Sequence, residues 1–325
     1  MTPREALQAA FERRVVNAPI PIWELEFHIW DKVAGRPLYL GREFEALDAA
    51  AQDRALHTNA ELLAEVAATL DFAALTVPGG YWEQAPGVPA YYWLPPEARL
   101  QQIPLLREAI GDERMLIAGS GGVICPPSKN LLEFVYKLFD APEEIDELAR
   151  RTLAGGLANA QRLRDLGIDA VFTASDVADN HGPFFSPPQT ARFVLPYLHD
   201  WAEGIKQLGL YGILHSDGQL TPLLEVVADS GIHGLQAIDP VAGMDLAATY
   251  QQVGDRLCLC GNVDCCVLLN GPIEAIDALT RQTLAACEGG AGFVLGASNA
   301  VARETPAEHY LALHAAWQEA GQRGG

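Results

Sequence analysis

The chain has 325 residues, of which about half are hydrophobic, so it can bury a large core, and its formal net charge of −20 makes it strongly acidic. That charge argues against nonspecific binding to nucleic acid or to an anionic membrane surface. No run of about 18 apolar residues is present, so we expect no transmembrane helix. The charged N-terminus reads as a helix start and not as a signal peptide, and four of the six cysteines lie within nine residues. We therefore expect a cytoplasmic protein with reduced thiols.

The first third of the chain mixes helices, short strands and one aromatic segment. The spacing of apolar residues predicts helices over residues 3–16 and 41–70 and strands over residues 19–27, 73–77 and 115–118. The segment 81–97 is rich in aromatic residues and proline, namely Trp82, Tyr91, Tyr92, Trp93, Pro86, Pro89, Pro95 and Pro96. This composition predicts an ordered loop that either covers a pocket or forms a dimer surface.

Beyond residue 130, predicted helices and strands alternate. The helices cover residues 130–167 with a break near Pro142, 187–208, 221–230, 245–253, 272–288 and 306–322. The strands cover residues 170–174, 211–214, 234–238, 256–259 and 292–295. This alternation is typical of a parallel sheet with right-handed crossovers, and about eight strands in all predict an α/β fold of the (β/α)₈ TIM-barrel type. We expect residues 1–325 to form a single barrel domain with an N-terminal helical extension.

Polar residues follow the predicted strands at the ends where a barrel of this type carries its active site. They are Glu26, Asp176, His215, Asp217, Asp239, Cys260, Asn262 and Asn299. The pair His215 and Asp217 is the clearest signal, because residues two apart on an extended segment point the same way. An imidazole beside a carboxylate can bind a metal or transfer protons, and it can also be a buried histidine held by its neighbour.

A catalytic zinc site needs further nitrogen, sulfur or oxygen ligands and one open position. Cys260 is the expected third ligand, with Glu26 as the other candidate, although a free cysteine is often a small core residue. Glu24, Glu26 and His28 alternate along one predicted strand, so they share a face that points either into the cavity or to solvent.

The loop that holds Asp176, Asn180 and His181 follows another strand. It is expected to carry substrate-binding or proton-transfer groups, and the alternatives are a helix cap for Asp176 and a loop anchor for His181. Together with Glu26, these three form the candidate catalytic set. Asn262 and Asn299 are the candidate cofactor-binding residues.

The C-terminal half of the chain resembles the uroporphyrinogen decarboxylase superfamily. The resemblance rests on Leu-His-Ser-Asp-Gly at 214–218, Gly-Asn-Val-Asp at 261–264, Gly-Gly-Ala-Gly-Phe-Val-Leu-Gly-Ala-Ser-Asn at 289–299, Thr305-Pro306, and Asn-His-Gly-Pro-Phe-Phe-Ser-Pro at 180–187. It implies a (β/α)₈ barrel in one of two branches. One branch decarboxylates porphyrinogens, and the other contains zinc-dependent methyltransferases that work with corrinoid proteins, coenzyme M or related thiols.

The decarboxylase branch fits this chain poorly. Its N-terminal signature supplies arginines that bind the acidic side chains of the tetrapyrrole, but Glu26 stands at the place of the first arginine and Trp30 near the second. A carboxylate there would repel a substrate with eight carboxylates. The essential aspartate that the family carries after the strand at 73–77 is also missing, since no acid follows before Glu83.

The methyltransferase branch fits better. Its coenzyme M enzymes hold zinc with a His-x-Cys pair and a cysteine on the last strand, where this chain has His215, Asp217 and either Ser298 or Asn299. The chain is more similar to relatives that demethylate methoxyaromatic or methylamine-type substrates. The resemblance implies a zinc-dependent methyltransferase that acts on a small methylated substrate with a corrinoid-binding partner protein or a thiol.

Two alternatives to methyl transfer remain open from the sequence. One is a metal-free decarboxylase or lyase that uses Asp176 or Asp217 as acid and base, and the other is a non-catalytic binding module. A homodimer is a further expectation, drawn from the aromatic loop.

Overall fold

Seven parallel strands form the main sheet of the computed structural model, which describes residues 1–79, 83–85, 88–89 and 94–323. The strands lie in the order β1-β4-β5-β8-β9-β10-β11, and each pairs in parallel with its neighbours. Their bounds are β1 (Ala74–Thr76), β4 (Met115–Gly119), β5 (Ala170–Ala174), β8 (Tyr211–His215), β9 (Gly234–Ala237), β10 (Cys258–Val263) and β11 (Phe293–Ala297). Because their order in space follows their order in the chain, each intervening helix returns the chain to the same end of the sheet.

An N-terminal segment closes this sheet into a barrel. Ile22 forms parallel bridges to Phe72, just before β1, and to Leu295 on β11. The Trp23 amide donates to the Leu295 carbonyl at 2.9 Å, and the Ala73 amide donates to the Ile22 carbonyl at 2.8 Å. The segment thus takes the place of an eighth strand between the two sheet edges, which confirms the (β/α)₈ prediction.

The predicted strand over residues 19–27 exists only as isolated bridges at Ile22 and Phe27, with a bend at Leu25 between them. Before the bend, Trp23 points into the barrel interior, where it joins the buried cluster of inward side chains. The bend changes which residues face inward, so the alternation predicted from the sequence does not persist through the whole segment.

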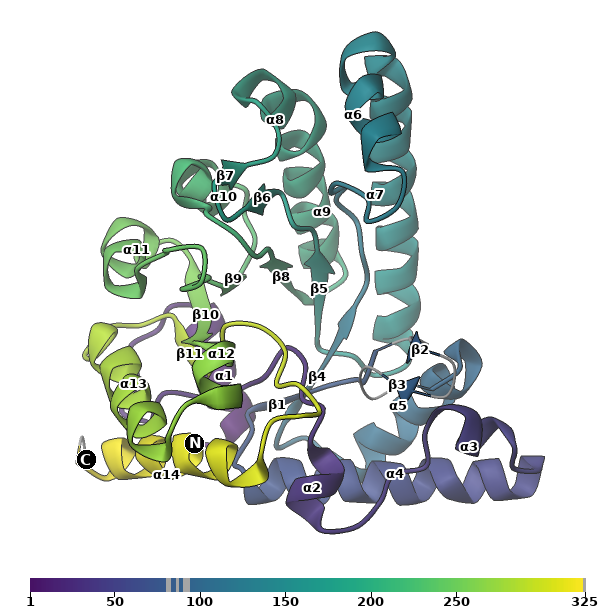
Figure 1. Ribbon diagram of the computed structural model, residues 1–325, viewed down its shortest axis with the longest axis vertical. Coiled ribbons are helices and arrows are strands. Elements are labelled where there is room, and N and C mark those ends of the chain that lie inside the picture. Colours follow the sequence, from purple (N-terminus) through teal and green to yellow (C-terminus); the bar gives the residue numbers. More distant parts are fainter. Residues whose placement is uncertain (80–82, 86–87, 90–93, 324–325) are drawn as a thin grey trace.

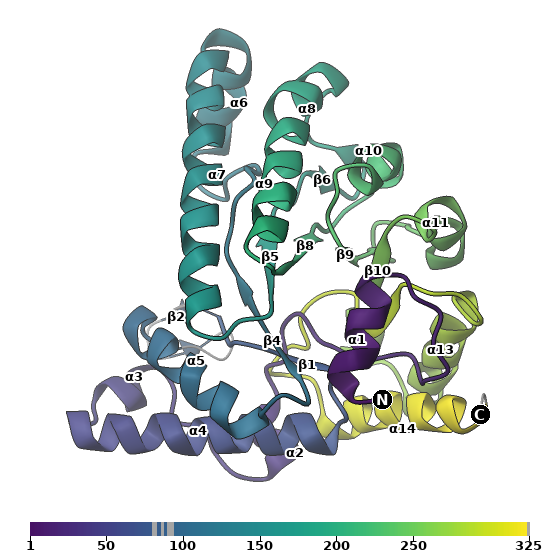
Figure 2. The ribbon, with the colours of Figure 1, turned by 180° about the vertical axis from the view of Figure 1, so that it is seen from behind.

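Helices surround the sheet, and the views in Figures 1 and 2 show them around the strands. They are α1 (Pro3–Phe11), α2 (Trp30–Ala34), α3 (Gly41–Glu45), α4 (Ala49–Thr69), α5 (Pro96–Ile110), α6 (Leu131–Asp140), α7 (Pro142–Asp165), α8 (Pro187–Phe193), α9 (Leu195–Gln207), α10 (Leu224–Ala228), α11 (Leu246–Val253), α12 (Cys265–Asn270), α13 (Ile273–Ala286) and α14 (Ala307–Arg323), with a 3₁₀ turn η1 at Thr221–Leu223. Two small antiparallel pairs complete the fold, namely β2 (Glu83–Ala85) with β3 (Val88–Pro89) and β6 (Ala178–Asp179) with β7 (Gly182–Pro183). No described helix is both long and apolar enough to cross a lipid bilayer.

Local capping chemistry explains where several helices begin. The predicted helix over 41–70 is two helices, because Asp48 caps α4 by accepting a hydrogen bond from the Ala51 amide at 2.8 Å. Pro142 opens α7 at its first position, which confirms the predicted break. Helix α5 begins at Pro96, inside the stretch that the sequence assigned to a loop. Much of the rest of that aromatic stretch, with Trp82, Tyr91, Tyr92 and Trp93, lies outside the described residues.

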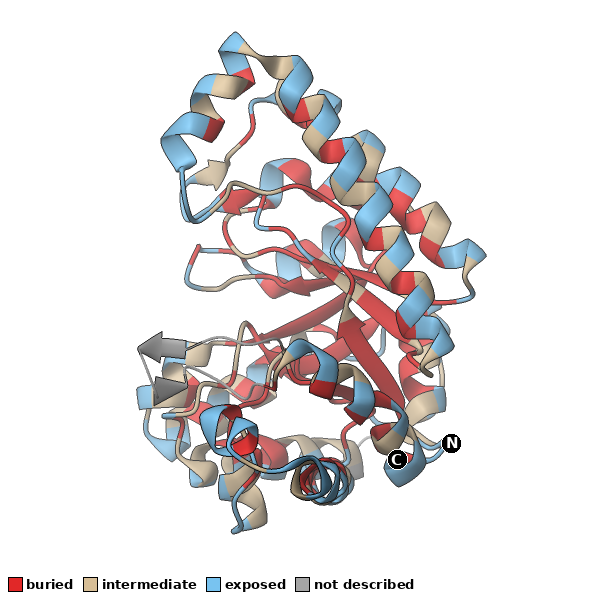
Figure 3. Cartoon of the chain, turned by 90° about the vertical axis from the view of Figure 1, so that its right-hand side faces the viewer, coloured by how far each residue is buried: buried red, intermediate tan, exposed pale blue. Residues whose placement is uncertain are grey.

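Two layers of apolar side chains stabilise the barrel, and Figure 3 shows the strands of the main sheet almost wholly buried. The inner cluster fills the barrel, and α1 contributes Leu7 and Phe11 to it, so this helix closes the N-terminal end. The outer cluster packs between the sheet and the surrounding helices. With its interior filled and one end covered by α1, the barrel offers polar groups to ligands at the opposite end.

Candidate functional site

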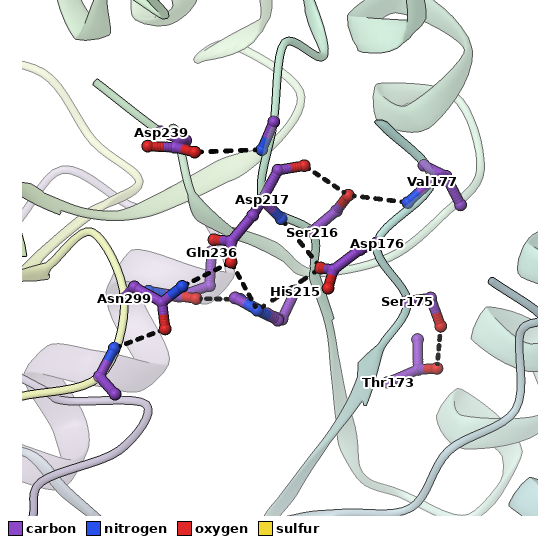
Figure 4. A network of polar contacts seen from close by, with 12 residues as sticks. Thr173, Ser175, Asp176, Val177, His215, Ser216, Asp217, Gln236, Asp239 and Asn299 are labelled. Atoms are coloured by element: carbon purple, nitrogen blue, oxygen red, sulfur yellow. Dashed lines mark hydrogen bonds and ion pairs between the residues drawn. The ribbon is translucent and has the colours of Figure 1, made fainter. Parts of the chain in front are cut away.

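Three polar side chains meet at the carboxyl end of two neighbouring strands. His215 is the last residue of β8 and pairs in register with Ala174, the last residue of β5. Asp217 and Asp176 each lie two residues further along, so the register brings them together. The Nε2 atom of His215 lies 3.8 Å from Asp176 Oδ1 and 3.9 Å from Asp217 Oδ2. We call these three residues the His–Asp–Asp cluster (Figure 4).

Gln236 fixes the orientation of the imidazole from below. Its side-chain amide donates to the carbonyls of Ala297 and Ser298 at 3.2 and 3.4 Å, so its Oε1 faces His215. That oxygen lies 2.5 Å from His215 Nδ1, which must therefore carry the proton. The other ring nitrogen, Nε2, faces the two carboxylates, and in the neutral imidazole it would present its lone pair there, as in metal-binding histidines.

Further hydrogen bonds hold the two aspartates in place. Asn299 donates through Nδ2 to Asp217 Oδ2 at 2.5 Å, and the Asp217 amide donates to Asp176 Oδ1 at 3.1 Å. The Gly218 amide donates to Asp239 Oδ2 at 3.2 Å. Loops that follow β5, β8, β9 and β11 thus meet at one point, as Figure 4 shows for their labelled side chains.

Asp217 has unusual electrostatics for an aspartate. Burial raises its pKa to about 6, and the negative charges of Asp176 and Asp239 act in the same direction against the lowering effect of His215. Its Oδ1 atom is buried and accepts no hydrogen bond from any described residue. A buried carboxylate oxygen without a partner is costly, and a positively charged ligand at the cluster would supply the missing partner.

The donor set fits a divalent metal such as zinc. One nitrogen from His215 and one carboxylate oxygen from each aspartate lie within 4.8 Å of one another. Imidazole nitrogen and carboxylate oxygen are both common zinc ligands, and three protein ligands leave the open position that a catalytic zinc keeps. Asp176, with its side chain 57% exposed, lies on the solvent side of the cluster, where a ligand can enter.

The expectation that Cys260 is the third ligand is wrong. Strand β10 runs on to Val263, so Cys260 lies in mid-strand and not at its end. Its thiol is buried in the inner apolar cluster and does not belong to the His–Asp–Asp cluster. Asp176, and not Cys260, lies together with His215 and Asp217. A second group of possible ligands, Asp264, Cys265 and Cys266, lies where β10 passes into α12.

The predicted acidic face of the first segment divides into two environments. Glu26 and His28 lie beyond the bend, line a small cavity and contact each other at 3.1 Å between His28 Nε2 and Glu26 Oε2. Glu24, before the bend, points away from the interior, accepting hydrogen bonds from the Tyr310 hydroxyl at 2.7 Å and the Ala297 amide at 2.9 Å. Glu24 therefore ties this segment to β11 and α14, and the prediction that all three side chains share one face is wrong.

Burial raises the pKa of Glu24 to about 8, which predicts a pH-dependent stability. Its folded pKa exceeds the unfolded value, so the folded state holds the proton more tightly and stability falls as pH rises from about 4.5 to 8. We expect wild type to lose up to about 4 kcal/mol of unfolding free energy over this window, and Glu24→Gln to lose distinctly less. Urea denaturation at pH 5, 6.5 and 8 measures both slopes, and equal slopes would contradict the prediction.

Of the other predicted site residues, Asn299 contacts the cluster through Asp217, whereas no hydrogen bond among the described residues joins Asn180, His181 or Asn262 to it. Asn180 and His181 occupy the exposed turn between β6 and β7, where the His181 amide donates to Asp179 Oδ1 at 2.7 Å and its ring is 94% exposed. Asn262 is buried and donates through Nδ2 to the Ile238 carbonyl at 3.0 Å. Gln236 was missed, although a polar residue inside the apolar stretch Gly-Leu-Gln-Ala was a visible signal.

Comparison with known proteins places this geometry in a family. The chain is 28% identical over 194 residues to a uroporphyrinogen decarboxylase of Coxiella burnetii, an overlap of 57% of this chain and 50% of that protein. It is 30% identical over 165 residues to a uroporphyrinogen decarboxylase of Xanthomonas axonopodis pv. citri, covering 48% of this chain and 43% of that one. The chain thus spans about half the length of the curated relatives it matches.

A solved structure matches the fold over nearly its whole length. A methyltransferase from Methanosarcina mazei superposes with a TM-score of 0.68 at 21% identity, covering 98% of this chain and 99% of that one. The model of the family described as uroporphyrinogen decarboxylase (URO-D) matches residues 99–320, which include β5 to β11 and the whole His–Asp–Asp cluster. The chain belongs to the uroporphyrinogen decarboxylase family.

Proposed function

We propose that this protein is a zinc-dependent methyltransferase that moves a methyl group between a small methylated substrate, a methoxy compound or an amine, and a corrinoid protein or thiol. The observation that carries the proposal is the His–Asp–Asp cluster, in which His215 Nε2 faces two carboxylates and Asp217 Oδ1 has no hydrogen-bond partner among the described residues. The fold shared with the Methanosarcina mazei methyltransferase supports it. The described residues 77–79 that follow β1 include no carboxylate, which disfavours porphyrinogen decarboxylation.

His215, Asp217 and Asp176 would hold the zinc. Zinc bound there would act as a Lewis acid that makes the substrate oxygen or nitrogen a better leaving group. Gln236 keeps the proton on His215 Nδ1, and Asn299 holds Asp217 by one oxygen. Because Asp217 must be ionised to bind a metal, its pKa of about 6 predicts that affinity for zinc declines below that pH.

A metal-free lyase is the second candidate, and the raised pKa of Asp217 favours it. A carboxyl group with a pKa of about 6 can exchange protons near neutral pH, and the exposed Asp176 beside it can act as its partner. In that case the cluster works as an acid–base pair, and His215 orients the two carboxyl groups.

One assay separates the two candidates. The chain, loaded with zinc or treated with chelator, is mixed with free cob(I)alamin and a panel of methoxylated aromatics and methylamines, and methylcobalamin formation is followed by its absorbance. Methylation that requires both the chain and zinc would support the proposal. If the chelator-treated protein releases carbon dioxide from carboxylated substrates and no methylation occurs, the methyltransferase proposal is wrong and the lyase is supported.

Gln236 offers a test of metal binding that leaves the ligands in place. Gln236→Leu removes the acceptor for His215 Nδ1 while keeping a side chain of similar size in the buried site. We expect zinc affinity, measured by competition with a chromogenic chelator, to fall by about 10–100-fold, as for other groups that orient metal ligands. The control Gln251→Leu changes an exposed residue on α11 and should leave the affinity unchanged. Equal zinc affinities in wild type, Gln236→Leu and Gln251→Leu would show that Gln236 does not support metal binding.

A further inference from the structure

A partly buried arginine lines the small cavity near the first segment of the barrel. Arg99 lies in the first turn of α5, and its Nε atom is buried and donates to no described residue. Burial lowers the pKa of the guanidinium, which shows that the surroundings give the charge little compensation. A partly buried guanidinium whose Nε–H finds no acceptor among the described residues is costly and needs a reason.

The cavity itself lacks a free counter-ion. It has a volume of about 30 Å³, enough for roughly two water-sized groups such as the two oxygens of a carboxylate. Glu26 is the single carboxylate among its described lining residues, and that carboxylate is held by His28 Nε2 at 3.1 Å. The remaining walls are largely apolar, with the rings of Trp30 and Phe172 among them.

The cavity lies at the same end of the barrel as the His–Asp–Asp cluster, because its lining includes residues 76–79, where β1 ends. Phe172 belongs to β5, the strand that continues to Asp176 four residues later. Four residues of extended chain span about 13 Å, so the cavity wall at Phe172 and Asp176 are at most about that far apart. An anionic end and a reactive end on opposite sides of an apolar body would match this arrangement.

We propose that Arg99 and this cavity form an anion-binding subsite, and that the substrate carries a carboxylate held by the Arg99 guanidinium. A guanidinium matches a carboxylate in a planar, two-point hydrogen bond, and the apolar walls strengthen that bond by excluding water. This inference rests on the proposed function for the role of the bound molecule as substrate. The binding itself requires neither zinc nor corrinoid.

Calorimetric titration of the chelator-treated protein tests the subsite apart from methyl transfer. The probes are benzoate, its uncharged analogue benzamide, and inorganic phosphate. We expect benzoate to bind at least 10-fold more tightly than benzamide, Arg99→Gln to abolish that difference, and Arg99→Lys to restore part of it. The control Arg162→Gln removes the same charge from an exposed position on α7 and should bind benzoate as wild type does.

Thermal denaturation separates this role from a structural one. Because the guanidinium without a counter-ion costs free energy when no ligand is bound, Arg99→Gln should melt no lower than wild type.

Equal binding of benzoate and benzamide by wild type, or unchanged benzoate binding by Arg99→Gln, would overturn the proposal. Binding of phosphate without benzoate would show that the carboxylate assignment is wrong. Loss of the fold in Arg99→Gln would assign Arg99 a structural role. If the protein binds benzoate but fails the methylation assay, the subsite proposal stands and the methyltransferase proposal is contradicted.

Discussion

His215→Ala is expected to strip zinc from the protein and to abolish methyl transfer while the barrel stays folded. The change removes the only imidazole of the His–Asp–Asp cluster and leaves two carboxylates that repel each other. Loss of groups that merely orient ligands costs about 10–100-fold in metal affinity, so loss of the ligand itself should cost more than about 100-fold. The unpaired Gln236 Oε1 that remains should cost about 1–3 kcal/mol of stability, which a domain this size can tolerate.

Elemental mass spectrometry of the purified proteins measures the zinc content per chain, and two further variants serve as controls. His57→Ala changes an exposed histidine on α4 and should keep about one zinc per chain. The double variant Cys265→Ser, Cys266→Ser removes the thiols of the second ligand group and should also keep it. If the double variant loses zinc and His215→Ala retains it, the metal site lies at the start of α12 and the proposed mechanism is wrong.

Gly296→Ala is expected to destabilise the whole barrel. A Cβ at this position would lie 2.3 Å from the carbonyl oxygen of Trp23, far inside van der Waals contact. The two backbone segments cannot move apart, because a 2.9 Å hydrogen bond joins the Trp23 amide to the Leu295 carbonyl. We call this contact between the N-terminal segment and β11 the seam of the barrel. We expect a loss of about 3 kcal/mol or more and a melting temperature lower by about 6 °C or more.

Gly296→Ala should also disturb the His–Asp–Asp cluster, because Gly296 is joined to residues that hold the cluster in place. Gly296 precedes Ala297 and Ser298, whose carbonyls hold the Gln236 amide, so a displaced seam would loosen the orientation of His215. Gly155→Ala is the control, because α7 offers that Cβ open space and alanine is the better helix former. We expect this control to hold or raise the melting temperature. A Gly296→Ala protein that melts like wild type would show that the seam is not essential for closure.

How well the sequence predicted the site depended on how local each signal was. His215 and Asp217 were found because two positions on one extended segment share a face, which needs no knowledge of the rest of the chain. The same rule failed at Glu24, because the bend at Leu25 interrupts the extended backbone on which the rule depends. The prediction also failed at Cys260, because the predicted strand ended before this residue whereas β10 continues to Val263. A thiol of the core was therefore expected at the end of the barrel that carries the site.

The sequence alone determined most of the barrel's strands and helices and the family of this protein. Its alternation of apolar segments with helical periods predicts a closed parallel barrel, and its short motifs around His215 and Asn299 point to the superfamily. Both signals are local, because each is set by neighbours within a few residues.

Only the tertiary structure decided which distant residues meet. Strand register placed Asp176 beside His215, and parallel packing placed Gln236 beneath it. Barrel closure set Glu24 against Tyr310, and the position of α5 set Arg99 against a cavity whose one described carboxylate, Glu26, contacts His28. These pairings join residues that are 21 to 286 positions apart where a hydrogen bond links them. They depend on the packing of the whole chain, which local sequence patterns do not encode.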